Sequence, residues 1–90
     1  MKHLKNNYAG KKIVVLSNGW NLIGNYHPED LKLTQASVIR VWDTTRGLGQ
    51  IALEGPTSET ILDPCGTVLL SESAILFFID VVYDQEKPTA

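Results

Sequence analysis

Apolar and β-branched residues occur along the chain in short runs separated by turn residues, which is the pattern of a mainly β protein. The first run covers residues 12–16, and Asn18-Gly19 after it is the dipeptide most typical of a tight β-hairpin. Apolar positions then recur over 20–26, as in a strand that buries one face, and Trp20 and Tyr26 on that face are expected in the core in preference to a ligand platform. The chain therefore begins with a predicted hairpin.

A long third strand is predicted over residues 31–42. Leu31 and Leu33 share one face of it, but both faces are largely apolar over 38–42. This change of pattern predicts a bent strand with a β-bulge near residues 35–37. Such a bend would help a small sheet to curl on itself.

After the third strand, the sequence favours a short helix. Residues 43–45 supply Asp and Thr side chains for an N-cap, and apolar residues at helical spacing follow until Gly55 and Pro56 end the run. A polar loop then leads to two further strands, predicted at 67–70 and 74–83.

Ninety residues build one domain, because a chain of this length has room for a single core. We expect the domain to cover 11–83, with a helix-bearing insertion at 43–64 and flexible ends at 1–10 and 84–90. The single cysteine excludes an internal disulfide, and no run approaches the roughly 20 apolar residues of a membrane span. The first residues lack the apolar run of a signal peptide, which predicts a cytoplasmic protein.

The fifth predicted strand is apolar on both of its faces. Alternation places four residues on one face, Ile75, Phe77, Ile79 and Val81, opposite a second apolar row. Leaving such a row in water would forfeit about 1.5–3 kcal/mol for each large side chain, so something should cover it. The cover is either the short helix or a second copy of the chain, and these four residues form our predicted oligomer interface.

Several short patterns carry a family likeness. They are the run 13–16, Gly19, Gly24, Leu31-x-Leu33-x-x-Ala36, and Gly66-x-Val68 followed by a short turn and by Ala74, Ile75 and Ile79. In this order they resemble the Sm-like family of small SH3-type barrels. The resemblance implies a five-stranded barrel, in which the predicted helix would be a short α-helical insertion between strands 3 and 4. It also implies rings in which the fourth strand of one subunit pairs with the fifth strand of the next. The chain departs from the family pattern in two ways: its sequence predicts no N-terminal helix, and the helix and loop at 43–64 would be an insertion.

A second likeness lies in Ala36-x-x-Ile39-Arg40-x-Trp42, followed by Gly47-Leu48-Gly49-Gln50-Ile51-Ala52-x-Glu54-Gly55. This stretch is similar to a group of small phage and prophage proteins. The resemblance implies a viral accessory protein in the host cell cytoplasm. Such proteins often counter host defence by binding a host protein or by binding a nucleotide signal.

Groups suited to catalysis are sparse. His3 lies in a predicted flexible end and His27 lies in a turn, and neither has a partner at a spacing typical of a catalytic site. No metal-ligand spacing occurs, and Cys65, between proline and glycine, fits a small buried or half-buried thiol better than a reactive one. We therefore expect a binding protein without cofactor, metal or enzymatic activity.

The best candidate for a ligand site is the turn before the predicted helix, with Arg40, Trp42, Thr44, Thr45, Arg46 and Gly47. Backbone N–H groups, Thr hydroxyls and the cation of Arg46 suit a phosphate or carboxylate, and Trp42 can stack on a base. The same residues also suit structural roles. A Thr can cap the helix, Trp42 can anchor it, and Arg46 can pair with Asp43 or Glu54.

Three functions fit these features. The first is a homo-oligomer that binds and sequesters a small nucleotide-like signalling molecule without turnover. The second is an inhibitor that docks on a host defence enzyme through a strand edge or through residues 43–64. The third is an Sm-like RNA- or DNA-binding protein, which the net charge of −2 and the pI of about 5.5 disfavour.

Overall fold

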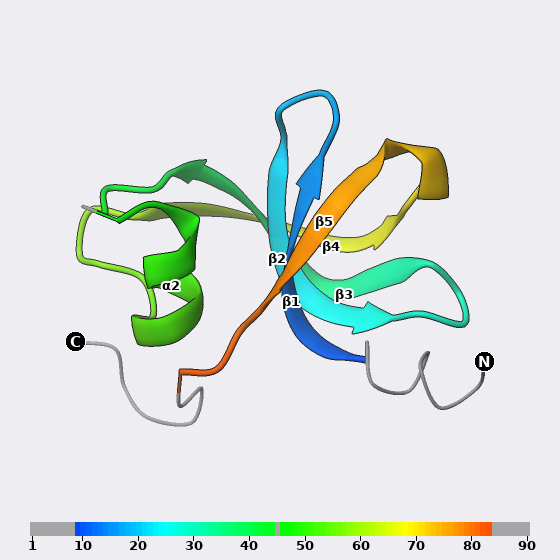
Figure 1. Cartoon of the computed structure of the whole chain (residues 1–90), viewed down its shortest axis with the longest axis horizontal. Helices are drawn as coiled ribbons and strands as arrows, with labels where there is room; N and C mark the ends of the chain where they lie inside the picture. The colour runs from blue at the N-terminus through cyan, green and yellow to red at the C-terminus, as the bar shows by residue number, and fades with distance from the viewer. Residues whose placement is uncertain (1–8, 45, 84–90) are drawn as a thin grey trace.

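The computed structural model describes residues 9–44 and 46–83, which contain five strands and one α-helix. The elements are β1 (Gly10–Leu16), β2 (Asn21–His27), β3 (Lys32–Val41), α2 (Leu48–Glu54), β4 (Ile61–Leu69), the 3₁₀ turn η1 (Glu72–Ala74) and β5 (Ile75–Asp80). The five strands form one antiparallel sheet in the order β4-β3-β2-β1-β5 (Figure 1). The prediction of a mainly β protein is confirmed. The predicted flexible ends lie outside the described residues, apart from Ala9 and Gly10, and Gly10 already belongs to β1.

The first two strands form the predicted hairpin. Their register runs from Gly10 opposite Tyr26 to Val15 opposite Asn21. Gly19 has a φ of 91°, a left-handed conformation that glycine adopts without steric cost. The Asn-Gly signal therefore located the turn correctly.

The third strand carries the predicted bulge. Ile23 pairs with Ser37 and Asn25 pairs with Thr34, so one residue of β2 faces two residues of β3. The one residue is Gly24, whose backbone closely approaches β3. The pattern of apolar residues therefore located this bulge correctly, and a bulge of this kind bends its strand.

The short helix α2 covers the predicted helical run, but its start differs from the prediction. It begins at Leu48 with Gly47 as its N-cap residue, and no side chain caps it. The expectation of a cap among residues 43–45 is therefore wrong, because Gly47, with a φ of 74°, turns the chain into the helix itself. No helix in residues 9–44 and 46–83 is long and apolar enough to cross a membrane.

The last two strands differ in length from the prediction. β4 begins at Ile61 rather than at residue 67, although it contains Pro64. It is an edge strand, where a proline that lacks an N–H group is tolerated. β5 ends at Asp80, and the chain then turns to α2, where the N–H groups of Val82 and Tyr83 donate to the Ala52 carbonyl at 2.8 and 3.3 Å.

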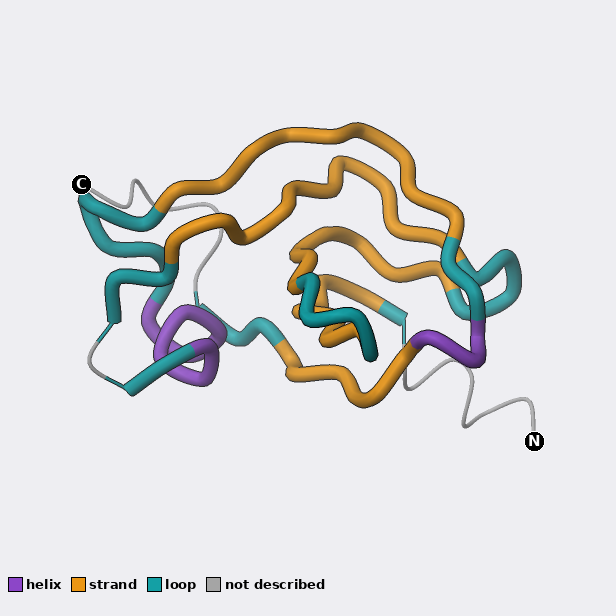
Figure 2. The backbone as a smooth tube through the Cα atoms, turned by 90° about the horizontal axis from the view of Figure 1, so that it is seen from above, coloured by secondary structure: helices purple, strands orange, loops and turns teal. Residues whose placement is uncertain are grey.

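Buried side chains form two clusters within the strongly twisted sheet (Figure 2). Ile13 and Val14 are adjacent in β1 but belong to different clusters. Successive side chains of a strand point to opposite faces, so the clusters lie on opposite faces of β1. The first contains Ile13, Ile23, Ile39, Ile51, Ala52 and Val81, and α2 covers it. The second contains Val14, Leu22, Tyr26, Leu33 and Ala36.

The four residues of the predicted interface do not share one open face. Phe77 is 53% exposed, but Val81 is buried and Ile79 is half-buried in the cluster that α2 covers. Ile75 packs in the other cluster. The helix is therefore the cover for part of this strand, and the expectation of a single apolar face formed by these four residues is wrong.

A bulge in β5 explains this difference. Val15 pairs with Phe77, whereas the next residue, Leu16, pairs with Ile75. Leu76 is thus an extra residue that breaks the alternation and places Ile75 and Phe77 on different faces. Leu76 and Phe77 remain the large apolar side chains of β5 that are exposed.

Candidate functional site

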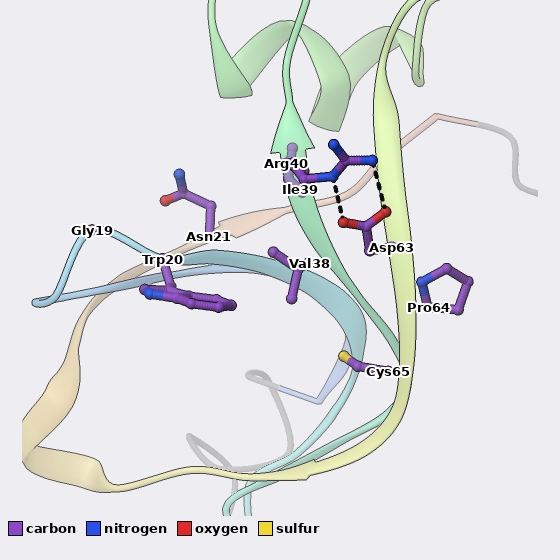
Figure 3. Close-up of a pocket in the computed structure, with 9 residues that line it drawn as sticks. All are labelled: Gly19, Trp20, Asn21, Val38, Ile39, Arg40, Asp63, Pro64 and Cys65. Carbon is purple, nitrogen blue, oxygen red and sulfur yellow. Dashed lines mark hydrogen bonds and ion pairs between the residues drawn. The ribbon is translucent and has the colours of Figure 1, made fainter.

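A pocket of about 410 Å³ lies in the corner between the hairpin turn of β1 and β2 and the paired strands β3 and β4 (Figure 3). It is lined by Gly19, Trp20, Asn21, Val38, Ile39, Arg40, Asp63, Pro64 and Cys65. The volume falls within the range of about 300–1,000 Å³ typical of sites for small molecules. An aromatic ring, aliphatic side chains and a pair of opposite charges therefore surround one hollow.

Trp20 supplies the aromatic surface of this pocket. It follows Gly19 in the turn, where its N–H donates to Oδ1 of Asn18 at 3.1 Å and its carbonyl accepts from the N–H of Leu16 at 3.0 Å. These bonds hold the residue just before β2 begins, and it is 54% exposed. The expectation that Trp20 is in the core is wrong. The alternation of apolar residues predicts a strand that includes Trp20, but β2 begins one residue later, at Asn21. Tyr26, within β2, is buried as expected.

Arg40 and Asp63 form an ion pair at the edge of the pocket. Nε of Arg40 donates to Oδ2 of Asp63 at 2.6 Å, and Nη2 donates to Oδ1 at 3.4 Å. Ile39 pairs with Leu62 and Val41 with Ile61, so Arg40 is the extra residue of a bulge in β3. Bulges of this kind redirect a side chain, and Arg40 here reaches the carboxylate on β4 (Figure 3).

A second hollow of about 330 Å³ adjoins the first. Both are lined by Trp20, Val38 and Cys65, and the second is otherwise formed mainly by Leu16, Leu22 and Val68. The indole of Trp20 therefore borders both the hollow that contains the Arg40–Asp63 pair and an almost wholly apolar one. Cys65 is an exposed free thiol at this boundary, so the expectation that it is a buried or half-buried thiol is not met.

The residues predicted from the sequence as a ligand site are divided by the structure. Arg40 lies in the pocket, whereas Trp42, Thr44, Arg46 and Gly47 lie in the turn between β3 and α2. Thr45 lies outside the described residues. Trp42 is 41% exposed, and a Cβ atom on Gly47 would lie 3.8 Å from its ring. Trp42 therefore packs beside the start of the helix.

Polar side chains of the turn bond within the turn and its neighbouring loop. The hydroxyl of Thr44 donates to the carbonyl of Gly47 at 2.7 Å, and Arg46 forms an ion pair with Glu54. The hydroxyl of Thr60 donates to the carbonyl of Trp42 at 2.7 Å. The pairing of Arg46 with Glu54 is one of the structural roles considered for the turn, whereas Thr44 bonds within the turn without capping the helix. These contacts favour the Trp20 pocket as the place for a ligand.

The residues that sequence reasoning missed come from two places. Trp20 was read as core, although its position directly after Asn18-Gly19 is a signal for the exposed end of a hairpin. The sequence predicts Asp63 in a polar loop and Cys65 in a turn after it, and their approach to the pocket depends on the pairing of Val38 with Asp63. No local pattern in the sequence encodes that register.

The groups that line the pocket are suited to binding a ligand. A guanidinium, a carboxylate, a side-chain amide and an indole can each bind a polar planar ligand by hydrogen bonds or stacking. Residues 9–44 and 46–83 contain no group of three or more His, Cys, Asp or Glu side chains that could hold a metal ion.

Comparisons of the chain with protein-family models, with curated proteins and with solved structures find no match.

Proposed function

We propose that the protein binds a small nucleotide-like ligand in the pocket of Trp20 and Arg40 and sequesters it without chemical turnover. The pocket carries this proposal, because it combines an exposed indole with a guanidinium in one hollow of suitable volume. Stacking on an aromatic side chain contributes about 1–3 kcal/mol for each base. A guanidinium has five N–H donors, so its two bonds to Asp63 leave capacity for a phosphate.

Sequestration requires affinity and abundance but no catalytic group. A protein that binds a signal tightly lowers its free concentration by mass action, so the receptor of that signal stays inactive. We place this activity in a phage-type accessory protein that counters host defence in the host cytoplasm. The likeness of residues 36–55 to small phage proteins supports this setting.

We further propose that the chain is a small barrel of the Sm-like type that assembles with copies of itself. The strand order, with β1 between β2 and β5, supports this fold. β4 and β5 are the two edges of the sheet, and both carry exposed apolar side chains, Leu69 on β4 and Leu76 and Phe77 on β5. Pairing β4 of one subunit with β5 of the next would satisfy both edges and cover these side chains.

A thermal-shift screen against cyclic and linear nucleotides tests the binding activity. A ligand present at 100 times its Kd stabilises the native state by about 2.7 kcal/mol, which for a domain of this size raises the Tm by roughly 10 °C or more. We expect such a shift with at least one nucleotide, and we expect to recover that nucleotide unchanged after heat denaturation. No shift with any nucleotide would contradict the proposal, and a degraded nucleotide would contradict the absence of turnover.

A second candidate function is inhibition of a host protein by docking. The observation that favours it is the open edge of β5, where Leu76 is 60% exposed beside Phe77. An edge strand of this kind can add to a sheet of another protein. A stable stoichiometric complex with one host enzyme, lost on Phe77→Glu and kept on Trp20→Ala, would favour docking over ligand binding.

A further inference from the structure

A carboxylate in the proposed pocket limits which ligands it can accept. Asp63 lies against Arg40, and the side chains of both are about half exposed. A water-exposed ion pair of this kind contributes little to stability, so it can open at small cost when a ligand offers better partners. The resting pocket therefore presents a cation and an anion that a ligand can separate.

For a ligand that is only an anion, Asp63 is unfavourable. The negative charge of Asp63 offsets the positive charge of Arg40 and repels a phosphate placed beside the pair. An ionised carboxylate is a hydrogen-bond acceptor without donors, so it becomes favourable when the ligand brings N–H groups to it. The ligand that suits the pocket combines an anionic group for Arg40, a planar ring for Trp20 and N–H donors for Asp63.

Among nucleobases, guanine meets this requirement best. Its N1–H and its N2 amino group are adjacent donors on one edge, and their spacing matches the two oxygens of a carboxylate. The corresponding edge of adenine places an acceptor beside its amino group. The edge of uracil places its N–H between two carbonyl oxygens that would repel Asp63.

We infer that the pocket selects guanine nucleotides, with Asp63 accepting from the guanine edge and Arg40 released to the phosphate. Trp20 stacks on the base, and the ion pair between Arg40 and Asp63 is the closed state that the ligand opens. This inference rests on the proposed function, because it names the ligand class of the same pocket.

Calorimetric titration of the full chain with GMP, IMP and AMP tests the selectivity. IMP differs from GMP in lacking the N2 amino group, so it removes one donor and leaves the phosphate unchanged. We expect GMP to bind at least about tenfold more tightly than IMP, since a hydrogen bond to a charged group is lost, and AMP to bind no better than IMP. Equal Kd values for the three nucleotides would overturn the inference.

Two variants separate the roles of the paired residues. Asp63→Asn should abolish the preference for GMP over IMP, whereas Glu29→Gln, which makes the same change of charge outside the pocket, should keep it. Arg40→Gln should weaken the binding of GMP, because the variant lacks the cation that binds the phosphate. It should not weaken the binding of guanosine, which has no phosphate, and the variant has no ion pair that Asp63 must break before it binds the base. Each variant is first compared with the natural chain by its thermal unfolding, so that a loss of fold is not mistaken for a loss of contact.

The outcomes distinguish the inference from the proposed function. A chain that binds nucleotides with no preference for guanine, or whose preference survives Asp63→Asn, retains the proposed function and loses the guanine assignment. Weakened guanosine binding in Arg40→Gln would overturn the release of Arg40 to the phosphate. A chain that binds no nucleotide at all would overturn both.

Discussion

Lys12 is a charged residue inside the fold, and its partner lies at the surface. Its side chain is 8% exposed and forms an ion pair with Asp80, whose side chain is 71% exposed. The two residues are also opposite each other in the pairing of β1 with β5. A buried ammonium group depends on its partner, because removing the partner leaves a charge without compensation in a poorly solvated place.

We predict that Asp80→Asn lowers the free energy of unfolding by about 2–3 kcal/mol. This loss is smaller than the about 3–5 kcal/mol found when a fully buried pair is broken, since water screens Asp80. Asp30→Asn is the matched control, because Asp30 pairs with Lys32 at 3.6 Å on the surface, and it should change stability by less than about 0.5 kcal/mol. Urea denaturation measures both, and equal losses would show that Lys12 does not depend on Asp80.

Two tyrosines should make the fold sensitive to high pH. Burial raises the pKa of Tyr83 above its ordinary value of 10.0. Burial, together with the nearby Glu72 carboxylate, raises the pKa of Tyr26 in the same way. The unfolded chain therefore loses these protons first, so the stabilisation is complete below pH 10 and declines as the pH rises through the folded-state pKa values.

We predict a falling urea midpoint from about pH 9 to about pH 11. Tyr83→Phe should make the fall less steep, because phenylalanine has no proton to lose. A slope that is unchanged in both Tyr83→Phe and Tyr26→Phe would contradict this cause.

At the scale of the elements, the close approach of β2 and β3 at their bulge depends on Gly24. A Cβ atom there would lie 3.0 Å from Cα of Ala36 and 3.1 Å from the carbonyl oxygen of Thr34. We predict that Gly24→Ala destabilises the protein by about 1–3 kcal/mol, because the backbone of β3 must move. Thermal unfolding measures this loss.

A glycine in the helix provides the matched control for this substitution. A Cβ atom on Gly49 would meet no atom within 4 Å, and Gly49 lies in α2. Gly49→Ala should therefore stabilise the protein by up to about 1 kcal/mol through helix propensity. A stabilising Gly24→Ala would show that the strands are farther apart than described.

The sequence was informative wherever structure depends on local signals. The hairpin at Asn18-Gly19, the bulge of β3 and the position of α2 each follow from turn residues or from periodicity. The missed features depend on contacts between distant segments. Pro64 suggested a loop although it lies in an edge strand, and the bulge at Leu76 changed the face on which Ile75, the first residue of β5, lies.

The same limit applies to the candidate site. Arg40 was identified from the sequence, but its partner Asp63 is on another strand, and the bulge that directs Arg40 is visible only in the register of β3 and β4. Trp42 and Arg46 had the right chemistry for a ligand. Their surroundings instead give Arg46 a partner in Glu54 and place Trp42 against the start of α2.

For the whole molecule, the two open edges of the sheet predict self-association. We expect light scattering at micromolar concentration to give a mass above that of the 10.0 kDa chain. Phe77→Glu should reduce this mass to that of a monomer, because it places a charge on the exposed part of β5. Leu53→Glu, an equivalent change on the exposed side of α2, should not. A strict monomer would contradict assembly through the strand edges.

The measurement that tests ligand binding at the Trp20 pocket most directly is a calorimetric titration of two tryptophan variants with the best nucleotide from the thermal-shift screen. Trp20 and Trp42 are both exposed, but one lines the pocket and the other packs at the start of α2. We predict that Trp20→Ala weakens binding by about tenfold or more, since one stacking contact is worth about 1–3 kcal/mol, and that Trp42→Ala retains the natural affinity. Loss of binding in Trp42→Ala with full binding in Trp20→Ala would contradict the assignment and place the ligand at the turn before the helix.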